Sequence, residues 1–303
     1  MHDATPGDPT MRDQAGGRVG DAGSAAIAAA EPFLPVETVG AASPGRADIL
    51  LLCDHASNAQ PPGIALGIAA EDMARHIAWD VGARGVTLAM AEALGAPAVL
   101  SRFSRLVIDP NRGEDDPTLV MKLYDGTLIA GNRHVDAAER ERRLAAYHRP
   151  YHEAITGGLD AMIAAGHAPK VVSIHSFTPQ LRNRPPRPWH VGLLWDRDAR
   201  LVEPLFETLA DERLSDGTHL VIGDNEPYTG ALQGDCMFRH GTARGLPHVL
   251  IELRNDLIVT EEGQGAWGRL LAGALLRALE RVPTAELSPG FGVGADAGRA
   301  SSP

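Results

Sequence analysis

Two histidines and one glutamate stand where the chain could build a catalytic site. His175 directly follows a short apolar run, His55 stands two residues after another, and Glu252 interrupts a third near its end. Two imidazoles and a carboxylate can hold a catalytic zinc ion and leave one coordination position open for water. The three positions therefore indicate a metal-dependent hydrolytic site. A hydrogen-bonded structural histidine is the alternative interpretation for each imidazole.

Glu252 carries a charge inside the otherwise apolar run 249–253. An ionised carboxylate is costly to bury unless a cation or a function accompanies it. Beside a metal-bound water, such a glutamate acts first as general base and then as general acid. A salt bridge with Arg254 or another arginine is the structural alternative.

Arginines are concentrated in the segment 101–112, SRFSRLVIDPNR, around the three apolar residues 106–108. The guanidinium group presents its N–H donors as a fixed fork that matches a planar carboxylate. The segment is therefore a candidate clamp for an acidic substrate, and a surface ion-pair network is the alternative. The candidate contacts within it are Arg102, Arg105, Asp109, Asn111 and Arg112.

Further polar groups are candidates for substrate contacts. His148 and His152 stand one helical turn apart and could chelate a metal, but Pro150 between them favours packing or a substrate contact. The string DNEPYTG at 224–230 has turn chemistry, and its tyrosine could donate to a substrate carbonyl or close a loop. The contacts predicted from these groups and from the glycine-bordered RHG at 239–241 are His152, Asn225, Tyr228 and His240.

Alternating apolar runs and helical periodicity predict the scaffold that positions these residues. The pattern is typical of an α/β fold, a three-layer sandwich with a central mixed, mostly parallel sheet. Ligands bind beyond the carboxyl ends of the strands in such sheets, so the polar residues after the apolar runs are expected to meet there. Strands are predicted at 48–53, 96–101, 105–108, 170–174, 190–194, 219–223 and 247–253, and helices at 70–94, 136–166 with a break near Pro150, 199–213 and 262–281.

Composition limits the classes of partner. The 303 residues carry 28 Lys and Arg against 39 Asp and Glu, a net charge of −11, which argues against nucleic acid or an anionic membrane. No apolar run is long enough to cross a bilayer, and the first residues lack the apolar core of a secretory signal. The two cysteines form no disulfide framework, which indicates a reducing compartment. We expect a cytoplasmic protein with a small-molecule partner and predict no oligomeric state.

The ends of the chain differ in composition from its middle. Residues 1–31 and 283–303 are rich in Gly and Ala and lack aliphatic periodicity, which predicts disordered tails. The length and pattern of residues 32–282 predict a single domain.

Several short motifs together resemble the N-formylglutamate amidohydrolase family. They occur in the order of that family and span most of the central region. The combination of SRLVIDPNR at 104–112 with IHSF at 174–177 is the most specific part of the resemblance. The other motifs are DHAS at 54–57, AWDVGA at 78–83, PYH at 150–152, DNEPYTG at 224–230, RHG at 239–241 and IELRNDLI at 251–258.

The resemblance implies a phosphorylase/hydrolase-like fold related to zinc carboxypeptidases and deacylases. It also implies one Zn²⁺, or another divalent metal, bound by His55, His175 and a carboxylate, for which Asp80 is the candidate. Asp54 competes for that role. The carboxypeptidase pattern has a glutamate three residues after its first histidine, where this chain has Asn58.

The implied reaction is hydrolysis of N-formyl-L-glutamate to formate and glutamate, a step of histidine degradation. A metal-bound water would be the nucleophile, Glu252 the general base, and Arg105 or Arg112 the group that stabilises the oxyanion. Another N-acyl amino acid, a short peptide or a cell-wall fragment is the alternative substrate. A non-catalytic protein that binds acidic ligands is the alternative of another class. The arginine-rich loop 182–187 has no assigned role.

Overall fold

The computed structural model describes residues 32–40, 46–214 and 216–290. The predicted N-terminal tail lies outside the described residues, as does the predicted C-terminal tail from residue 291 onward. The elements described below belong to the compact unit Phe33–Pro303, in which Leu287 is still buried against the core. Within the described ranges, no helix has both the length and the apolarity required to span a membrane.

A seven-stranded mixed sheet forms the centre of this unit, in the order β1-β3-β2-β6-β9-β7-β8. The strands β3, β2, β6 and β9 run parallel, β1 and β7 are antiparallel to their neighbours β3 and β9, and β8 is parallel to β7. The α/β class and the mixed, mostly parallel sheet are thereby confirmed. The strands are β1 (Val36–Val39), β2 (Ile49–Cys53), β3 (Ala98–Ser101), β6 (Lys170–Phe177), β7 (Val191–Leu194), β8 (Ile222–Asp224) and β9 (His248–Arg254).

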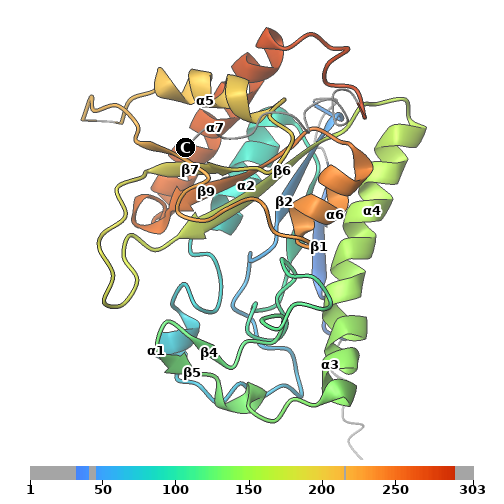
Figure 1. Cartoon of the computed structure of the whole chain (residues 1–303), viewed down its shortest axis with the longest axis vertical. Coiled ribbons are helices and arrows are strands. Elements are labelled where there is room, and N and C mark those ends of the chain that lie inside the picture. Colours follow the sequence, from blue (N-terminus) through green and yellow to red (C-terminus); the bar gives the residue numbers. More distant parts are fainter. Residues whose placement is uncertain (1–31, 41–45, 215, 291–303) are drawn as a thin grey trace, which may run out of the picture. The chain divides into compact units, whose positions relative to one another are not determined.

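Helices cover both faces of the sheet, which makes three layers. In β2, Ile49 and Leu51 face the cluster that contains α2, α5 and α7, whereas Leu50 and Leu52 face α4 and α6. Burial on both faces explains why the central strands read as continuous apolar runs. Figure 1 shows α4 and α6 to the right of the sheet. The helices are α2 (Ala83–Leu94), α4 (Arg149–Ala164), α5 (Val202–Ala210), α6 (Cys236–His240) and α7 (Glu261–Arg281).

A third apolar cluster lies among the connections that follow β2 and β3. Phe103, Leu106 and Ile108 are fully buried there and pack in one cluster with Tyr147. This cluster gives the long connections a core of their own beside the ends of the parallel strands. The short elements of this region are α1 (Ala70–Met73), β4 (Leu123–Tyr124), β5 (Thr127–Leu128), the 3₁₀ turn Ala130–Asn132 and α3 (Ala137–Arg143).

Two predicted elements differ from the structure. The predicted strand 105–108 is wrong, because this run forms turns whose apolar side chains are buried in the third cluster. Its backbone is satisfied locally, since Val107 N donates to Ser104 O over 2.9 Å. The helix predicted over 70–94 is divided into α1 and α2, and the irregular connection between them carries Asp80.

The helical region predicted over 136–166 changes geometry just before Pro150. A π-helical segment, Leu144–His148, connects α3 to α4. Pro150 is the second residue of α4, and His148, the residue before α4, is itself in the right-handed helical conformation. The helical backbone therefore continues through the proline, and its hydrogen-bond pattern changes from π-helical to α-helical there.

Asp48 connects the starts of β2, the strand before His55, and β6, the strand that carries His175. Its carboxylate accepts hydrogen bonds from Arg46 Nε at 2.8 Å and from Lys170 Nζ at 2.9 Å. Burial raises the Asp48 pKa, but these two hydrogen bonds outweigh it and lower the pKa from 3.8 to about 2. The interaction therefore stabilises the fold above pH 4 and is lost as the pH falls toward 2.

We expect Asp48→Asn to lower the free energy of unfolding at pH 7, because it removes the charged acceptor of both hydrogen bonds. The loss should be roughly 1 kcal/mol, since solvent screens this partly exposed carboxylate. The effect should be much smaller at pH 2, because this pH has reached the Asp48 pKa of about 2 and half of the wild-type carboxylate is protonated. Urea unfolding at both pH values measures the difference. Asp211→Asn is the control, since Asp211 is exposed and has no ion pair within the described residues. An equal loss at both pH values would show that charge is not the cause.

Candidate active site

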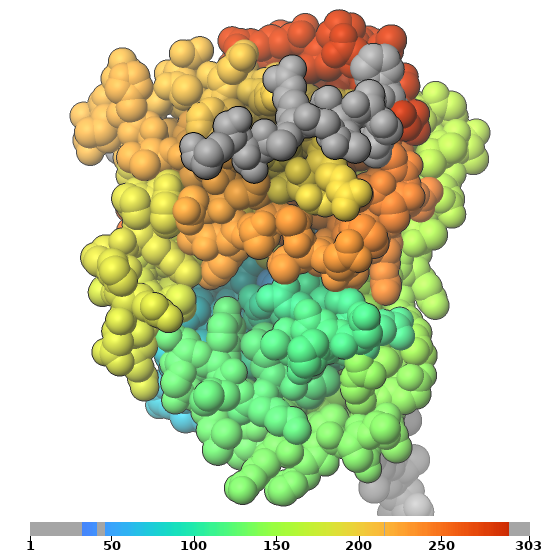
Figure 2. Space-filling view, in the orientation of Figure 1, coloured from blue at the N-terminus to red at the C-terminus, as the bar shows by residue number. Residues whose placement is uncertain are grey.

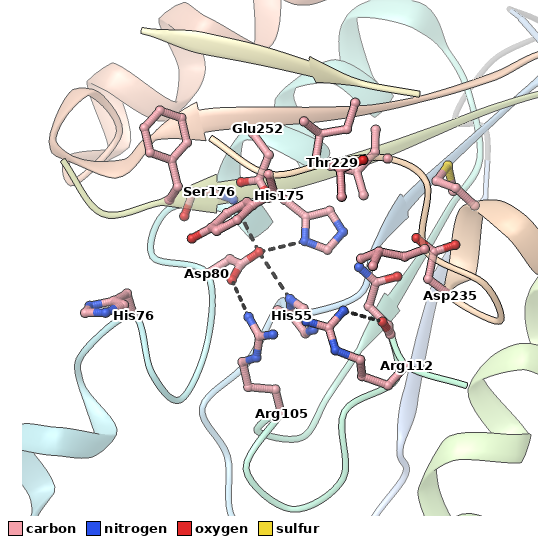
Figure 3. A pocket seen from close by; sticks show the side chains of 18 of the residues that line it. His55, His76, Asp80, Arg105, Arg112, His175, Ser176, Thr229, Asp235 and Glu252 are labelled. Carbon is pink, nitrogen blue, oxygen red and sulfur yellow. Dashed lines mark hydrogen bonds and ion pairs between the residues drawn. The ribbon is translucent and has the colours of Figure 1, made fainter. Parts of the chain in front are cut away.

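Three side chains from separate elements converge at the carboxyl ends of β2 and β6. His55 follows β2, His175 lies in β6, and Asp80 lies in the connection before α2. Asp80 Oδ2 is 2.8 Å from His175 Nδ1 and 3.3 Å from His55 Nδ1, and Figure 3 shows both imidazoles directed at this carboxylate. All three residues are buried and their ligand atoms lie within 4.8 Å of one another. We call these three residues the inner cluster.

The outer nitrogen of each imidazole contacts a second carboxylate. His55 Nε2 lies 2.7 Å from Asp109 Oδ1, and His175 Nε2 lies 2.8 Å from Asp54 Oδ2. A carboxylate in this position accepts the Nε2 hydrogen and leaves the Nδ1 lone pair directed inward, as is usual around metal-ligating histidines. Asp54 thus contacts the outer nitrogen of His175, whereas Asp80 contacts the inward Nδ1 atoms of both imidazoles.

The buried charge here is negative when both imidazoles are neutral. Asp54, Asp80 and Asp109 are at most 3% exposed. Arg105 is the cation beside them, 2.7 Å from Asp109 and 3.6 Å from Asp80, so it offsets one of three anions. Burial lowers the His175 pKa, but hydrogen bonds to Asp54 and Asp80 outweigh it and raise this pKa well above its usual value. The ligand set and its charge therefore fit a divalent cation.

Glu252 lies beside the inner cluster on β9. The parallel pairing of β6 with β9 places Glu252 opposite His175. Glu252 Oε2 is buried and has no hydrogen-bond partner within the described residues, and burial raises the Glu252 pKa to about 7. The alternative salt bridge with Arg254 is not formed, because that arginine pairs with Asp256. A carboxyl group of this kind can hold or release a proton near neutral pH.

The inner cluster opens into a pocket of about 390 Å³. Residues from several connections line it, among them the aromatic side chains of Tyr124, Phe177, Trp195 and Tyr228. In Figure 2 the orange residues and the green residues face each other across a recess in which blue parts of the chain are visible. The site is therefore concave, with an aromatic wall and a charged floor.

The structure separates the polar residues of the segment 101–112. Arg105, Asn111 and Arg112 line the pocket, and Asp109 lies behind His55. Arg112 Nη1 donates to Asn111 O at 3.0 Å but has no ion pair within the described residues, so its charge is available to a ligand. Arg102 is exposed and does not line the pocket, because its neighbours Phe103 and Ser101 are the buried side chains at that point.

The loop at 224–230 lines the pocket, and the loop at 182–187 supports it through Arg187. Arg187 Nη1 donates to Tyr228 Oη at 3.1 Å, and its guanidinium lies 5.0 Å from the centre of the Tyr228 ring. Asn225 does not line the pocket; its Oδ1 accepts from Trp195 N at 3.0 Å and so holds the loop in place. Tyr228 is thus the predicted contact from this loop that faces the pocket.

The structure places His152 and His240 outside this pocket. They lie on α4 and α6, and His152 Nδ1 is 2.8 Å from His240 Nε2. Their side chains contact each other rather than the space beside Glu252.

Sequence reasoning did not identify several pocket residues. Trp195 follows the apolar run that ends at Leu194, so the positional signal that located His55 could have found it. Thr229 also lines the pocket and lies in the DNEPYTG motif, whereas Asp235 and His76 stand in connections where the sequence gives no comparable signal.

A sequence profile described as N-formylglutamate amidohydrolase matches residues 47–259. The chain belongs to this family. The matched range contains the inner cluster and Glu252, so the family region and the pocket coincide. The resemblance predicted from the motifs is thereby confirmed.

Two solved structures are similar to this member of the N-formylglutamate amidohydrolase family. The gene product Atu2144 from Agrobacterium tumefaciens is 36% identical, with a TM-score of 0.74 over 81% of this chain and 95% of that one. The N-formylglutamate amidohydrolase from Ralstonia eutropha JMP134 is 22% identical, with a TM-score of 0.62 over 82% of this chain and 98% of that one, a likeness that shows the fold. A comparison with curated proteins finds no match.

Proposed function

We propose that this protein hydrolyses the amide bond of a small N-acyl acidic amino acid, with N-formyl-L-glutamate as the substrate. The family supplies the reaction class, and the convergence of His55, His175 and Asp80 beside Glu252 is the observation that supports a metal-dependent mechanism. A relation to zinc carboxypeptidases, a cytoplasmic location, a place in histidine degradation and a single domain at 32–282 belong to the same proposal.

The inner cluster would hold one Zn²⁺, although other divalent ions accept the same ligands. A zinc ion bound there would lower the pKa of a water molecule and polarise the carbonyl oxygen of the substrate. The carboxylates of Asp109 and Asp54 fix the orientation of the two imidazoles through their Nε2 atoms. The ligand geometry is thus built before substrate arrives.

Glu252 would move the proton. Its Oε2, which has no partner within the described residues, and its pKa of about 7 suit a group that accepts a proton from the attacking water and returns it to the leaving amine nitrogen. Arg105 lines the same pocket and supplies positive charge beside the oxygen on which negative charge develops.

The size of the pocket favours a small substrate. Its volume of about 390 Å³ lies at the low end of the range for ligand pockets, roughly 300 to 1,000 Å³. This volume suits a single N-acyl amino acid better than a peptide or a cell-wall fragment. Arg112, which faces the pocket without an ion pair in the described part of the chain, would bind a substrate carboxylate.

We expect Arg112→Gln to raise KM for N-formylglutamate about 10- to 100-fold, because a hydrogen bond to a charged group contributes about 1.5–3 kcal/mol. The value of kcat should change little, since Arg112 is expected to act on the carboxylate rather than on the reacting carbon. Steady-state kinetics measure both constants. Arg102→Gln is the matched control in the same segment. An equal effect of both variants on KM would contradict the assignment of Arg112.

A substrate series tests the proposed specificity. We expect kcat/KM to fall from N-formylglutamate to N-formylglutamine, because the amide removes the charge that Arg112 would bind, and to fall again for N-acyl dipeptides that exceed the pocket. Formate or carboxylate release measures each rate with wild-type protein. Equal kcat/KM for glutamate and glutamine derivatives would contradict recognition of an acidic side chain.

A further inference from the structure

A second group of metal-ligand side chains lies between α4 and α6. His152 comes from α4, and Cys236 and His240 come from the two ends of α6. All three are buried, and one ligand atom from each lies within 4.8 Å of the others. Cys236 and His240 are one helical turn apart and therefore face the same side of α6. We call these three residues the second cluster.

The two imidazoles of the second cluster are closely packed and incompletely hydrogen-bonded. Their rings are stacked, with centroids 5.1 Å apart, and His152 Nδ1 lies 2.8 Å from His240 Nε2. This contact uses one nitrogen of each ring. His152 Nε2 is buried and has no hydrogen-bond partner within the described residues. A buried imidazole nitrogen without a partner is costly unless something else binds it.

Both imidazoles are held in the form that binds metals. Burial lowers the His240 pKa to about 4 and lowers the His152 pKa well below its usual value. Both rings are therefore neutral at pH 7 and carry one lone pair each, and a metal ion would replace the hydrogen bond that joins them. The Cys236 thiol is protonated, because burial and the charge of Asp54 raise its pKa.

We propose that His152, Cys236 and His240 bind a second divalent cation of the zinc type, separate from the inner cluster. Two imidazoles and a thiolate are ligands that suit Zn²⁺ and Co²⁺. Binding forms two nitrogen–metal bonds and one sulfur–metal bond, and the thiol proton is released to solvent. No group is oxidised or reduced.

The site has a route to solvent and a connection to the active site. His152 also lines a second surface cavity, of about 450 Å³, together with Arg149, Glu153 and Arg239. On the other side, Met237 of α6 lines the pocket beside the inner cluster. An ion bound to the second cluster would join α4 to α6 and so hold this wall of the pocket in position.

Cobalt substitution tests the proposal with a signal that the inner cluster cannot give. Thiolate-to-cobalt charge-transfer absorption in the near ultraviolet requires a sulfur ligand, and the inner cluster contains none. We expect metal-stripped full-length protein to develop this band on addition of Co²⁺ and to saturate it at one equivalent. The band should be absent from Cys236→Ser and retained in Cys53→Ser, the other buried cysteine.

Zinc analysis provides a second measurement that does not depend on spectroscopy. We expect Cys236→Ser to bind one equivalent of zinc fewer than wild type, with circular dichroism confirming that the variant is folded. Wild-type protein that is folded but shows no charge-transfer band would overturn the proposal. The band without formate release would support the second cluster and contradict the proposed function. Formate release without the band would support the proposed function and overturn the proposal for the second cluster.

Discussion

Replacing Glu252 with glutamine is expected to reduce kcat for formate release about 10²- to 10⁴-fold, the range typical of lost general acid–base catalysis. Glutamine preserves the size of the side chain, but its amide cannot accept a proton from the attacking water. Glu252 is not a member of the inner cluster, so bound metal and KM should change little. Steady-state kinetics with parallel metal analysis measure all three quantities.

The control for this variant is Glu203→Gln, on the exposed side of α5 and outside the pocket. It should retain the wild-type rate. A Glu252→Gln protein that keeps more than a tenth of the wild-type kcat would exclude Glu252 as the proton acceptor. Loss of the metal in this variant would instead show that Glu252 helps to hold it.

Asp80→Ala is expected to abolish both formate release and metal binding at the inner cluster, because it removes the carboxylate shared by His55 and His175. Asp54→Asn should be much milder. Asp54 contacts the outer nitrogen of His175, and loss of such an indirect partner typically weakens metal affinity about 10- to 100-fold. The pair of variants therefore separates a ligand from a residue that orients a ligand.

The measurement is the zinc concentration that restores half of the formate release to metal-stripped protein. This zinc concentration reports metal binding at the inner cluster alone, even when a second ion is bound elsewhere. Circular dichroism of each variant checks the fold. A greater loss of activation by zinc in Asp54→Asn than in Asp80→Ala would reverse the assignment of the third ligand.

The central sheet was predictable from the sequence because its strands are buried on both faces. Continuous apolar runs located β2, β6 and β9, and the polar residues at their ends identified His55, His175 and Glu252. These three side chains meet because parallel strands bring their carboxyl ends to one edge. The residue pattern alone therefore indicates the two histidines and the glutamate of the candidate site.

Other parts depended on packing between distant segments. Asp80 interrupts a region with helical periodicity, and its contact with His175 spans residues far apart in the chain, so only the family resemblance indicated it. The turns at 105–108 have the apolar pattern of a strand because the third cluster, rather than a sheet, buries them. The edge strand β1 and the hairpin β4–β5 were not predicted, since short and partly exposed strands carry little apolar pattern.

The positions of His152 and His240 also depend on packing between distant segments. Their motifs suggested substrate contacts, but the packing of α4 against α6 places the two imidazoles beside each other and beside Cys236. Likewise, Arg102 and Arg112 belong to one arginine-rich segment, and the turns after β3 leave one exposed and direct the other to the pocket. Residue type identified candidates, and tertiary packing separated them.

The most direct test of a metal-dependent N-formylglutamate hydrolase is formate release by wild-type protein before and after removal of bound metal. We predict release of formate from N-formylglutamate by the metal-loaded protein, its loss on chelation, and its recovery when Zn²⁺ or another divalent ion is returned. Undiminished formate release by metal-free protein would contradict the role of the inner cluster, and metal-loaded protein that releases no formate would contradict the substrate.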